Sequence, residues 1–180
     1  MIASFIMTSL DGFFEGDKPW EIEWHRTDDE FNVFATEQLD EFDTLVFGRA
    51  TYEGMAGYWP SDEAARSDPE VASRMNGARK IVVSRTLDAP QPAWTNTTLV
   101  KDARDLPADG RLLVLGSAVL TTSLLEAGLL DELRIMLNPV LIGSGRSIAS
   151  SATRRIPLRL LDRRDFRNGN ILLTYAAEAT

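Results

Sequence analysis

Cysteine is absent from this 180-residue sequence, and histidine occurs once, as His25. The lack of cysteine excludes disulfides, thiolate nucleophiles, cysteine-based zinc sites and iron–sulfur clusters. One histidine cannot build a multi-histidine metal site, and a Ser-His-Asp triad would have to use His25 itself. An all-oxygen magnesium site stays open as an alternative, but no carboxylates show a recognisable ligand spacing, so we expect no metal site. His25 lies in a loop-like stretch, where a surface or packing role is the favoured interpretation.

Long apolar runs are also missing. The longest, such as residues 112–115 and 140–142, stop far short of the roughly 20 residues that span a bilayer. The N-terminus lacks the basic region and apolar run of a secretory signal. We therefore expect a cytoplasmic protein that does not contact membranes. With 44% hydrophobic and 26% charged residues, the chain has the composition of a globular protein, and we expect one domain over residues 1–180.

Basic residues are too few for a nucleic-acid partner. The formal net charge is −8, whereas nucleic-acid binding depends on Lys and Arg that neutralise phosphates. Residues 1–70 hold 17 acidic and 4 basic side chains, and residues 71–180 hold 10 acidic and 15 basic ones. The second part could therefore bind a small phosphorylated ligand. An unevenly charged, solvated surface is an equally good explanation.

Alternating apolar runs and helical periodicities predict an α/β fold. Strands are expected at residues 2–9, 44–47, 80–83 and 112–115. A helix capped by Thr27 or Asp28 should run to Phe42, and others should cover 49–57, parts of 61–77, and 117 to about Gly128. This alternation indicates a mostly parallel central sheet with helices on both faces.

The last third of the chain has a different pattern. Residues 133–137, 139–142, 158–166 and 171–175 are predicted as strands, and the last two are joined by a turn that contains Asn168-Gly169. The sheet should therefore end in antiparallel strands. The Gly143-Ser144-Gly145 stretch is interpreted as a turn between strands.

Three predicted strands end in small, hydroxyl or basic residues. These ends are Gly48-Arg49-Ala50-Thr51, Ser84-Arg85 and Gly116-Ser117. Ligands of open α/β sheets bind beyond the carboxyl ends of the strands, where helix N-termini attract phosphates. Each junction alone is weak evidence, but together they indicate a dinucleotide with an additional phosphate. Neither G-x-G-x-x-G after the first strand nor G-x-x-x-x-G-K-[ST] occurs, so neither a Rossmann site nor a P-loop is supported.

These segments carry a family resemblance. The matching stretches, which extend over almost the whole chain, are residues 9–12, 48–53, 83–87, 124–133 and 139–145. The sequence resembles the dihydrofolate-reductase-like family, and within it the branch of the RibD C-terminal domain, the reductase domain of riboflavin biosynthesis. We expect no RibD deaminase half within these 180 residues, because its zinc signature needs cysteines and the sequence has none.

The resemblance implies a three-layer dihydrofolate-reductase-like fold that binds NADPH. Met7 and Thr8 would then lie near the nicotinamide, and Ser84 and Arg85 near the 2′-phosphate. The remaining phosphate and pyrophosphate contacts would come from Gly48, Arg49, Thr51, Gly116, Ser117, Ala118 and Val119. Family members commonly have Gly-Gly where this chain has Gly116-Ser117. The resemblance also implies a homodimer, as in other family members, with the edge of the sheet that follows Asp131 as an interface.

The proton donor that such a reductase needs is not assigned by the sequence. In dihydrofolate reductases a carboxylate on the first helix supplies the proton. Counting back from Gly48 without gaps places Asn32 at the corresponding position, with Asp28, Asp29 and Glu30 nearby. Asp11 is a candidate catalytic residue because it follows the first strand. An Asp before Gly is nevertheless more often a turn residue.

Two groups of side chains, one aromatic and one basic, could bind the substrate, and each also has a structural interpretation. Trp20, Trp24, His25, Tyr58 and Trp59 could stack on a flat heterocycle or simply pack in the core. The arginines at 154, 155, 159, 163, 164 and 167 could bind a substrate phosphate, although their spacing favours a solvated strand face. The leading hypothesis is an NADPH-dependent reductase of the RibD type, like 5-amino-6-(5-phosphoribosylamino)uracil reductase, acting on a small heterocycle or carbonyl compound. The alternatives are a dihydrofolate reductase and a non-catalytic NADPH-binding protein.

Overall fold

The computed structural model describes residues 1–178. Its main sheet has eight strands in the order β5-β4-β3-β6-β1-β7-β10-β9. In this order the strands from β5 to β7 are parallel to one another, and β10 is antiparallel to both β7 and β9. The bounds are β1 Ile2–Ser9, β3 Thr44–Gly48, β4 Arg79–Val83, β5 Thr97–Val100, β6 Leu112–Leu115, β7 Glu132–Asn138, β9 Leu158–Asp165 and β10 Ile171–Ala177. The predicted α/β class and the antiparallel end of the sheet are confirmed.

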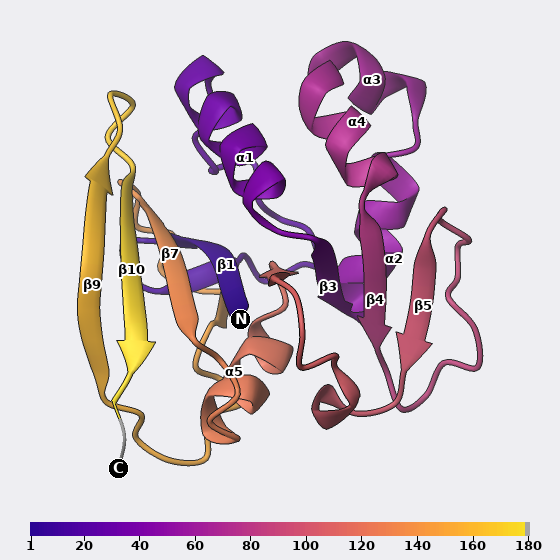
Figure 1. Cartoon of the computed structure of the whole chain (residues 1–180). Coiled ribbons are helices and arrows are strands. Elements are labelled where there is room, and N and C mark those ends of the chain that lie inside the picture. Colours follow the sequence, from indigo (N-terminus) through magenta and orange to yellow (C-terminus); the bar gives the residue numbers. More distant parts are fainter. Residues whose placement is uncertain (179–180) are drawn as a thin grey trace.

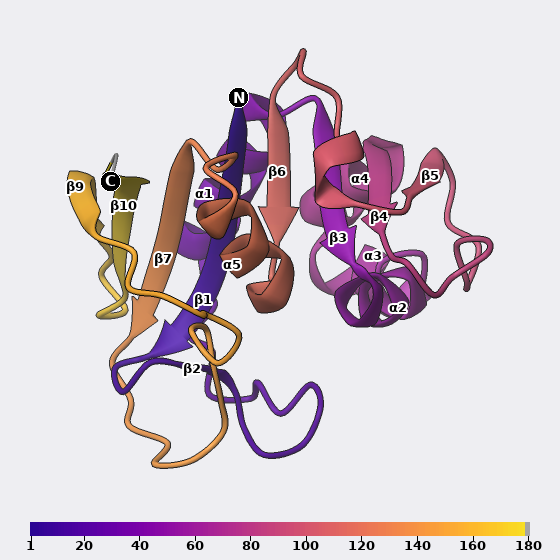
Figure 2. The same cartoon turned by 90° about the horizontal axis from the view of Figure 1, so that it is seen from below.

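Helices cover both faces of the sheet (Figure 1). Turned by 90°, α5 lies in front of the strands while α1 and α4 lie behind them (Figure 2). The helices are α1 Asp29–Glu41, α2 Arg49–Tyr58, α3 Asp62–Ser67, α4 Pro69–Gly77 and α5 Ala118–Glu126, with a 3₁₀ turn at Ala103–Asp105. No helix within residues 1–178 is long and apolar enough to cross a membrane.

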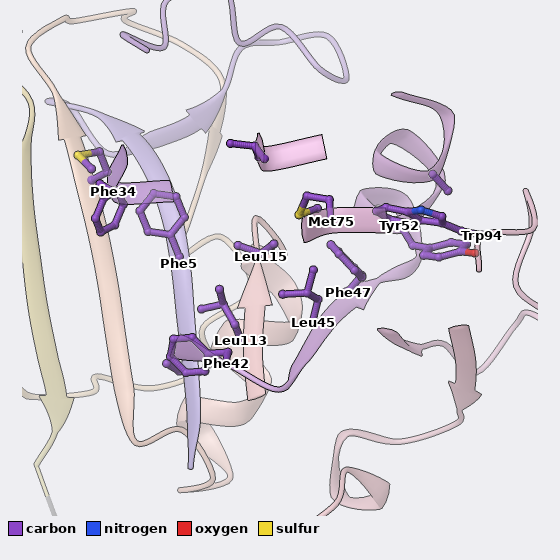
Figure 3. Close-up of a cluster of buried hydrophobic side chains, with 14 of the residues drawn as sticks. Phe5, Phe34, Phe42, Leu45, Phe47, Tyr52, Met75, Trp94, Leu113 and Leu115 are labelled. Carbon is purple, nitrogen blue, oxygen red and sulfur yellow. The ribbon is translucent and has the colours of Figure 1, made fainter. Parts of the chain in front are cut away.

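Period-two alternation in the central strands builds a core on each side of the sheet. Leu113 and Leu115 of β6 pack with the cluster under α1, α2 and α4, whereas Leu112 and Val114 pack with α5. Figure 3 shows the first cluster, in which Phe5 and Phe34 lie with ring centroids 5.6 Å apart. One core lies on each face of the sheet, between the strands and the helices that cover them. The helices, the sheet and the helices on its other face are the three layers that the family resemblance implies.

Local signals placed several element ends correctly. The Asp28 side chain accepts a hydrogen bond from the Phe31 N–H at 2.9 Å and caps α1. Beyond α5, Gly128 has φ +68°, the left-handed conformation that commonly follows a helix end. The predicted turn between β9 and β10 contains Gly169 at φ +91°.

The expected strand at 139–142 is wrong. These residues form a loop, because Pro139 has no N–H to continue the ladder and the next polar groups bond to the turn after β1. The Leu10 N–H donates to the Val140 carbonyl at 2.8 Å, and the Gly143 N–H donates to the Asp11 carboxylate at 2.8 Å. Strand β5 was not predicted, and neither was the small pair of β2 (Phe13–Glu15) with β8 (Arg146–Ser147).

Candidate functional site

The three predicted strand ends lie side by side because β4, β3 and β6 are parallel neighbours in the sheet. Their carboxyl ends open into one cleft of about 1250 Å³. The predicted cofactor residues that line it are Met7, Gly48, Arg49, Thr51, Ser84, Arg85, Gly116, Ser117, Ala118 and Val119. Thr8 is not part of the lining. It is fully buried at the end of β1, and its Oγ1 has no partner in residues 1–178.

Ser117 connects two of these junctions. Its Oγ accepts a hydrogen bond from the Gly48 N–H at 2.8 Å, so the start of α2 is tied to the start of α5. Gly116 has φ +63°, which suits glycine, and a Cβ added there would lie 3.4 Å from Cγ2 of Thr51. The departure from the family's Gly-Gly pattern at Ser117 therefore adds a specific contact between the ends of β3 and β6.

The loop after β4 is shaped by Ser84. Its buried Oγ lies 3.3 Å from the backbone nitrogens of both Thr86 and Leu87, which turns the chain sharply after the strand. Arg49 reaches this loop from α2: its Nε donates to Glu53 at 2.7 Å and one terminal nitrogen donates to Thr86 Oγ1 at 3.3 Å. The guanidinium of Arg49 is thus oriented toward the turn that carries the exposed Arg85.

Three further basic residues of the cleft, Lys101, Arg104 and Arg146, were missed in the sequence. Lys101 and Arg104 line it just beyond β5, and the Lys101 ammonium donates to the Leu87 carbonyl. Their position depends on β5 being parallel to β4. Because the Thr-rich β5 was not predicted, nothing in the sequence placed these side chains in the same cleft as Arg85.

A loop from Gly16 to Thr27 borders the cleft next to α2. Trp20 adopts φ +64°, and its N–H donates to the buried Glu15 carboxylate at 3.0 Å. The other oxygen of Glu15 lies 2.7 Å from Arg146 of β8. The indole of Trp20 lies over Gly54, where an added Cβ would be 1.9 Å from the ring. The loop is thereby held by Glu15 on one side and α2 on the other.

The aromatic residues of the predicted substrate region are only partly brought together. Trp20, His25, Tyr58 and Trp59 line the cleft, whereas Trp24 does not. His25 Nε2 is buried without a partner in residues 1–178, and its ring meets Trp24 edge-on at 4.4 Å. Burial lowers the pKa of His25 to about 4, so the imidazole is neutral near neutral pH.

Polar groups of α1 and α4 meet at the far end of the cleft. The Asn32 side-chain amide donates to Asp68 Oδ1 at 2.9 Å, and both residues line the cleft. Gln38, also in the lining, is only 4% exposed, and its Oε1 has no partner in the described chain. Asn32 is the residue that the sequence placed where dihydrofolate reductases have a carboxylate. A carboxylate does reach this region, but it comes from Asp68, before α4.

Asp11, the candidate proton donor, lies outside the cleft lining. Its carboxylate accepts the N–H groups of Gly143 at 2.8 Å and Ile142 at 3.3 Å. A hydrogen bond from the Ser9 side chain, followed by the Gly143 amide, holds the pKa of Asp11 below its usual range. This geometry fits the turn role that the Asp-Gly pair suggested. Within residues 1–178, no group of three His, Asp or Glu side chains is arranged to hold a metal.

The C-terminal arginines lie away from the cleft. Arg163 bonds Asp165 at 2.7 Å, Arg164 bonds Glu37 at 3.1 Å and Arg167 bonds Glu30 at 3.2 Å. They belong to β9 and the following turn, at the edge of the sheet. The solvated strand face is therefore the arrangement that the structure has.

Comparisons with known proteins agree with this architecture. Residues 1–172 match the family model described as the RibD C-terminal domain. The uncharacterized protein YyaP of Bacillus subtilis is 28% identical over 174 residues, which cover 94% of this chain and 91% of YyaP.

Two solved structures extend the comparison. A Shewanella protein assigned to riboflavin biosynthesis superposes with a TM-score of 0.71 at 23% identity, covering 99% of both chains. The dihydrofolate reductase of Enterococcus faecalis, solved with NADP(H), superposes with a TM-score of 0.58 at 16% identity, covering 99% of this chain and 97% of that one. The fold is thus dihydrofolate-reductase-like, and the match over residues 1–172 shows that the chain belongs to the RibD C-terminal domain family.

Proposed function

We propose that the protein is an NADPH-dependent reductase of small flat heterocyclic or carbonyl substrates. The observation that carries this proposal is the meeting of three parallel strand ends, two helix N-termini and four basic side chains at one end of the cleft. The basic residues are Arg49, Arg85, Lys101 and Arg104. Family membership and the NADP(H) complex of a protein with the same fold support it.

The residues present fit this cofactor. The starts of α2 and α5 offer backbone N–H groups and the positive ends of helix dipoles to a pyrophosphate. Gly116 lets the group come close to the backbone. Arg85 projects from the turn after β4 without a side-chain partner in residues 1–178, so its guanidinium is available to a 2′-phosphate. Met7 lines the cleft at the end of β1, where a nicotinamide would lie.

When bound, NADPH would supply a hydride to the carbon of a C=N or C=O bond, leaving NADP⁺. The nitrogen or oxygen must then gain a proton, which would come from water, because the amide of Asn32 does not ionise in this pH range. An asparagine in place of the first-helix carboxylate argues against the alternative that the protein is a dihydrofolate reductase. Phe31, Leu39 and Trp59 provide apolar walls that exclude water around the acceptor.

The test is titration of the protein with NADPH and separately with NADH, followed by nicotinamide fluorescence. Micromolar binding with a strong preference for NADPH is expected, and absence of binding by either nucleotide would refute the proposal. Oxidation of NADPH in the presence of a heterocycle panel would then separate a reductase from a non-catalytic NADPH-binding protein. Binding without turnover over a broad panel would favour the latter.

We further infer that the chain forms a homodimer through the sheet edge at β9. This edge strand exposes Leu158, Leu160 and Leu161, and exposed apolar edges favour pairing. Light scattering should give the mass of a dimer. Leu160→Lys should shift the mass toward that of one chain, whereas a monomeric unmodified protein would refute the inference.

A further inference from the structure

Arg146 is a further basic side chain of the cleft, and it lies apart from the four that support the proposed function. Those four follow β3, β4 and β5, whereas Arg146 belongs to β8. Strand β8 pairs with β2, which follows β1 after a short turn (Figure 2). In the sheet, β1 is separated from β4, which ends before Arg85, by β6 and β3. Arg146 therefore brings positive charge to the part of the cleft beyond β1.

The segment around Arg146 packs on the side of the sheet that α5 covers. The guanidinium lies 5.0 Å from the centroid of the Phe14 ring, and Phe14 packs against the core cluster that includes Leu120 of α5. Ile148 is fixed to the same helix, because its carbonyl accepts the Thr122 hydroxyl at 3.1 Å. Arg146 and the start of α5 therefore border the cleft from the same face of the sheet.

The donors of Arg146 are not used up by the protein. Its Nη1 lies 2.7 Å from Glu15 Oε1, but this oxygen has no hydrogen bond of good geometry within residues 1–178. The Arg146 side chain is 51% exposed. A guanidinium carries five N–H donors in a planar fork, a shape that suits carboxylates and phosphates. Arg146 can therefore keep its ionic contact with Glu15 and still donate to a second anion.

Glu15 makes a cation necessary at this place. It lines the cleft although it is only 8% exposed. The first turn of α5 has no side-chain cap, so its N–H groups are left for a pyrophosphate. A pyrophosphate adds negative charge to the same cleft, and a buried carboxylate repels it unless a cation compensates. Within residues 1–178, Arg146 is the basic side chain that contacts Glu15.

Glu15 also connects Arg146 to the loop from Gly16 to Thr27. Its Oε2 accepts the Trp20 N–H at 3.0 Å. Gly145 lies so close to Glu15 that an added Cβ would be 2.3 Å from the Glu15 carbonyl oxygen, and this close approach sets Arg146 beside the carboxylate. A change in the position of Arg146 is therefore passed to Trp20 through one side chain.

We propose that Arg146 binds the nicotinamide side of the cofactor pyrophosphate while it remains paired with Glu15, and that it thereby holds the loop from Gly16 to Thr27 when the cofactor is bound. The proposal rests on the proposed reductase function, because it adds a residue to the NADPH site. Arg146 is the binding residue. Glu15 is a positioning residue that acts through Arg146 and Trp20.

Calorimetric titration with NADPH and with adenosine 2′,5′-bisphosphate, which lacks the nicotinamide side, tests the binding role. Arg146→Ala should weaken NADPH about 10- to 100-fold, as expected for hydrogen bonds between charged groups, and should change the affinity of the bisphosphate by less than about threefold. Arg155→Ala is the control, because it removes the same charge from an exposed position between β8 and β9, outside the cleft lining. It should leave both affinities within about twofold.

Arg146→Ala also leaves Glu15 buried without its cation, so a double variant that adds Glu15→Gln separates the two causes. Gln keeps an acceptor for the Trp20 N–H and carries no charge. NADPH binding should remain about 10-fold or more weaker in the double variant. Recovery of full affinity would show that Arg146 only neutralises Glu15, and it would overturn the binding role. Thermal melting checks that each variant is folded.

Cleavage by a glutamate-specific protease after the exposed Glu21 and Glu23 measures the state of the loop. Saturating NADPH should slow this cleavage severalfold in the unmodified protein and in Arg155→Ala, but not in Arg146→Ala. NADPH affinity unaffected by Arg146→Ala, an equal loss for the bisphosphate, or protection of the loop that persists in Arg146→Ala would each overturn the proposal. Absence of NADPH binding by the unmodified protein would be recognised first, and it would refute the reductase function together with this proposal.

Discussion

Trp20 lies so close to Gly54 that an added Cβ on the glycine would be 1.9 Å from the indole Cζ2. The contact joins the loop that borders the cleft to the middle of α2. Because Trp20 also has φ +64°, an uncommon conformation for a bulky residue, the packing and the Glu15 hydrogen bond must hold it there. The position of the loop therefore depends on the absence of a side chain at residue 54.

Gly54→Ala should displace Trp20 and loosen the loop. The methyl group has no room, so we expect a loss of about 1–3 kcal/mol in the free energy of unfolding, or release of the loop, with faster proteolysis between residues 16 and 27. Tryptophan fluorescence, urea unfolding and limited proteolysis measure these effects. Gly57→Ala is the matched control on the same helix, because no other part of residues 1–178 lies within 4 Å of the position that its Cβ would take. The free energy of unfolding of the control variant should rise by up to about 1 kcal/mol. Equal changes in stability and proteolysis for the two variants would contradict the packing argument.

The arginines beside Ser84 should discriminate between nucleotides. Arg85→Ala should weaken NADPH about 10- to 100-fold and leave NADH nearly unchanged, because only NADPH carries the 2′-phosphate. Arg49→Ala should act in the same direction, since its guanidinium is oriented next to this turn by Glu53 and Thr86. Fluorescence titration measures both nucleotides. Arg66→Ala, on exposed α3, is the charge-matched control, and equal losses for both nucleotides would assign the arginines another role.

Ser117→Ala should destabilise the junction of β3 and β6. The Gly48 N–H loses its acceptor, and leaving such a group unpaired costs about 1–3 kcal/mol of the free energy of unfolding. NADPH affinity should fall as well, because the starts of α2 and α5 line the same part of the cleft. Ser123→Ala, in the same helix, removes a hydroxyl whose only hydrogen bond within residues 1–178 is to the Val119 carbonyl, and it should be nearly neutral. Denaturant unfolding that shows no difference between these variants would refute the bridging role of Ser117.

Apolar runs were enough to predict the buried part of the sheet. Strands β1, β3, β4 and β6 are short apolar segments buried on both faces, and such segments followed by Gly or Ser mark their own ends. Because β4, β3 and β6 are adjacent and parallel, the residues after them came together as the sequence predicted. Strand β5 escaped prediction because it is a half-exposed edge strand that begins with two threonines. Lys101 and Arg104 were missed with it.

The far end of the cleft was beyond sequence reasoning for another reason. Asn32 and Asp68 are 36 residues apart and meet only because α1 packs against α4. Nothing local distinguishes Asp68 from an ordinary helix cap, since Asp before Pro at a helix start is a common capping pattern. Its side chain is nevertheless directed to Asn32. A contact that depends on helix packing leaves no spacing signal in one sequence.

The buried His25 should make the stability of the protein depend on pH. Its folded pKa of about 4 lies below the 6.5 of the unfolded chain, so between these values the unfolded state binds a proton that the folded state does not. The contribution is fully present above pH 6.5 and is lost as the pH falls toward 4. Since the ring is partly exposed, we expect a loss on the order of 2 kcal/mol over this range.

His25→Gln isolates this effect, because Gln does not titrate. Carboxylates such as Glu41, whose pKa is lowered by a hydrogen bond from Arg134, also reduce stability in acid, but they do so in both proteins. Urea unfolding of both proteins at about pH 7 and about pH 5 gives, for each protein, the change in the free energy of unfolding between the two pH values. The unmodified protein should lose more stability than the variant between these values. Parallel losses would mean that His25 is protonated in the folded state as readily as in the unfolded chain, and that Nε2 has access to water.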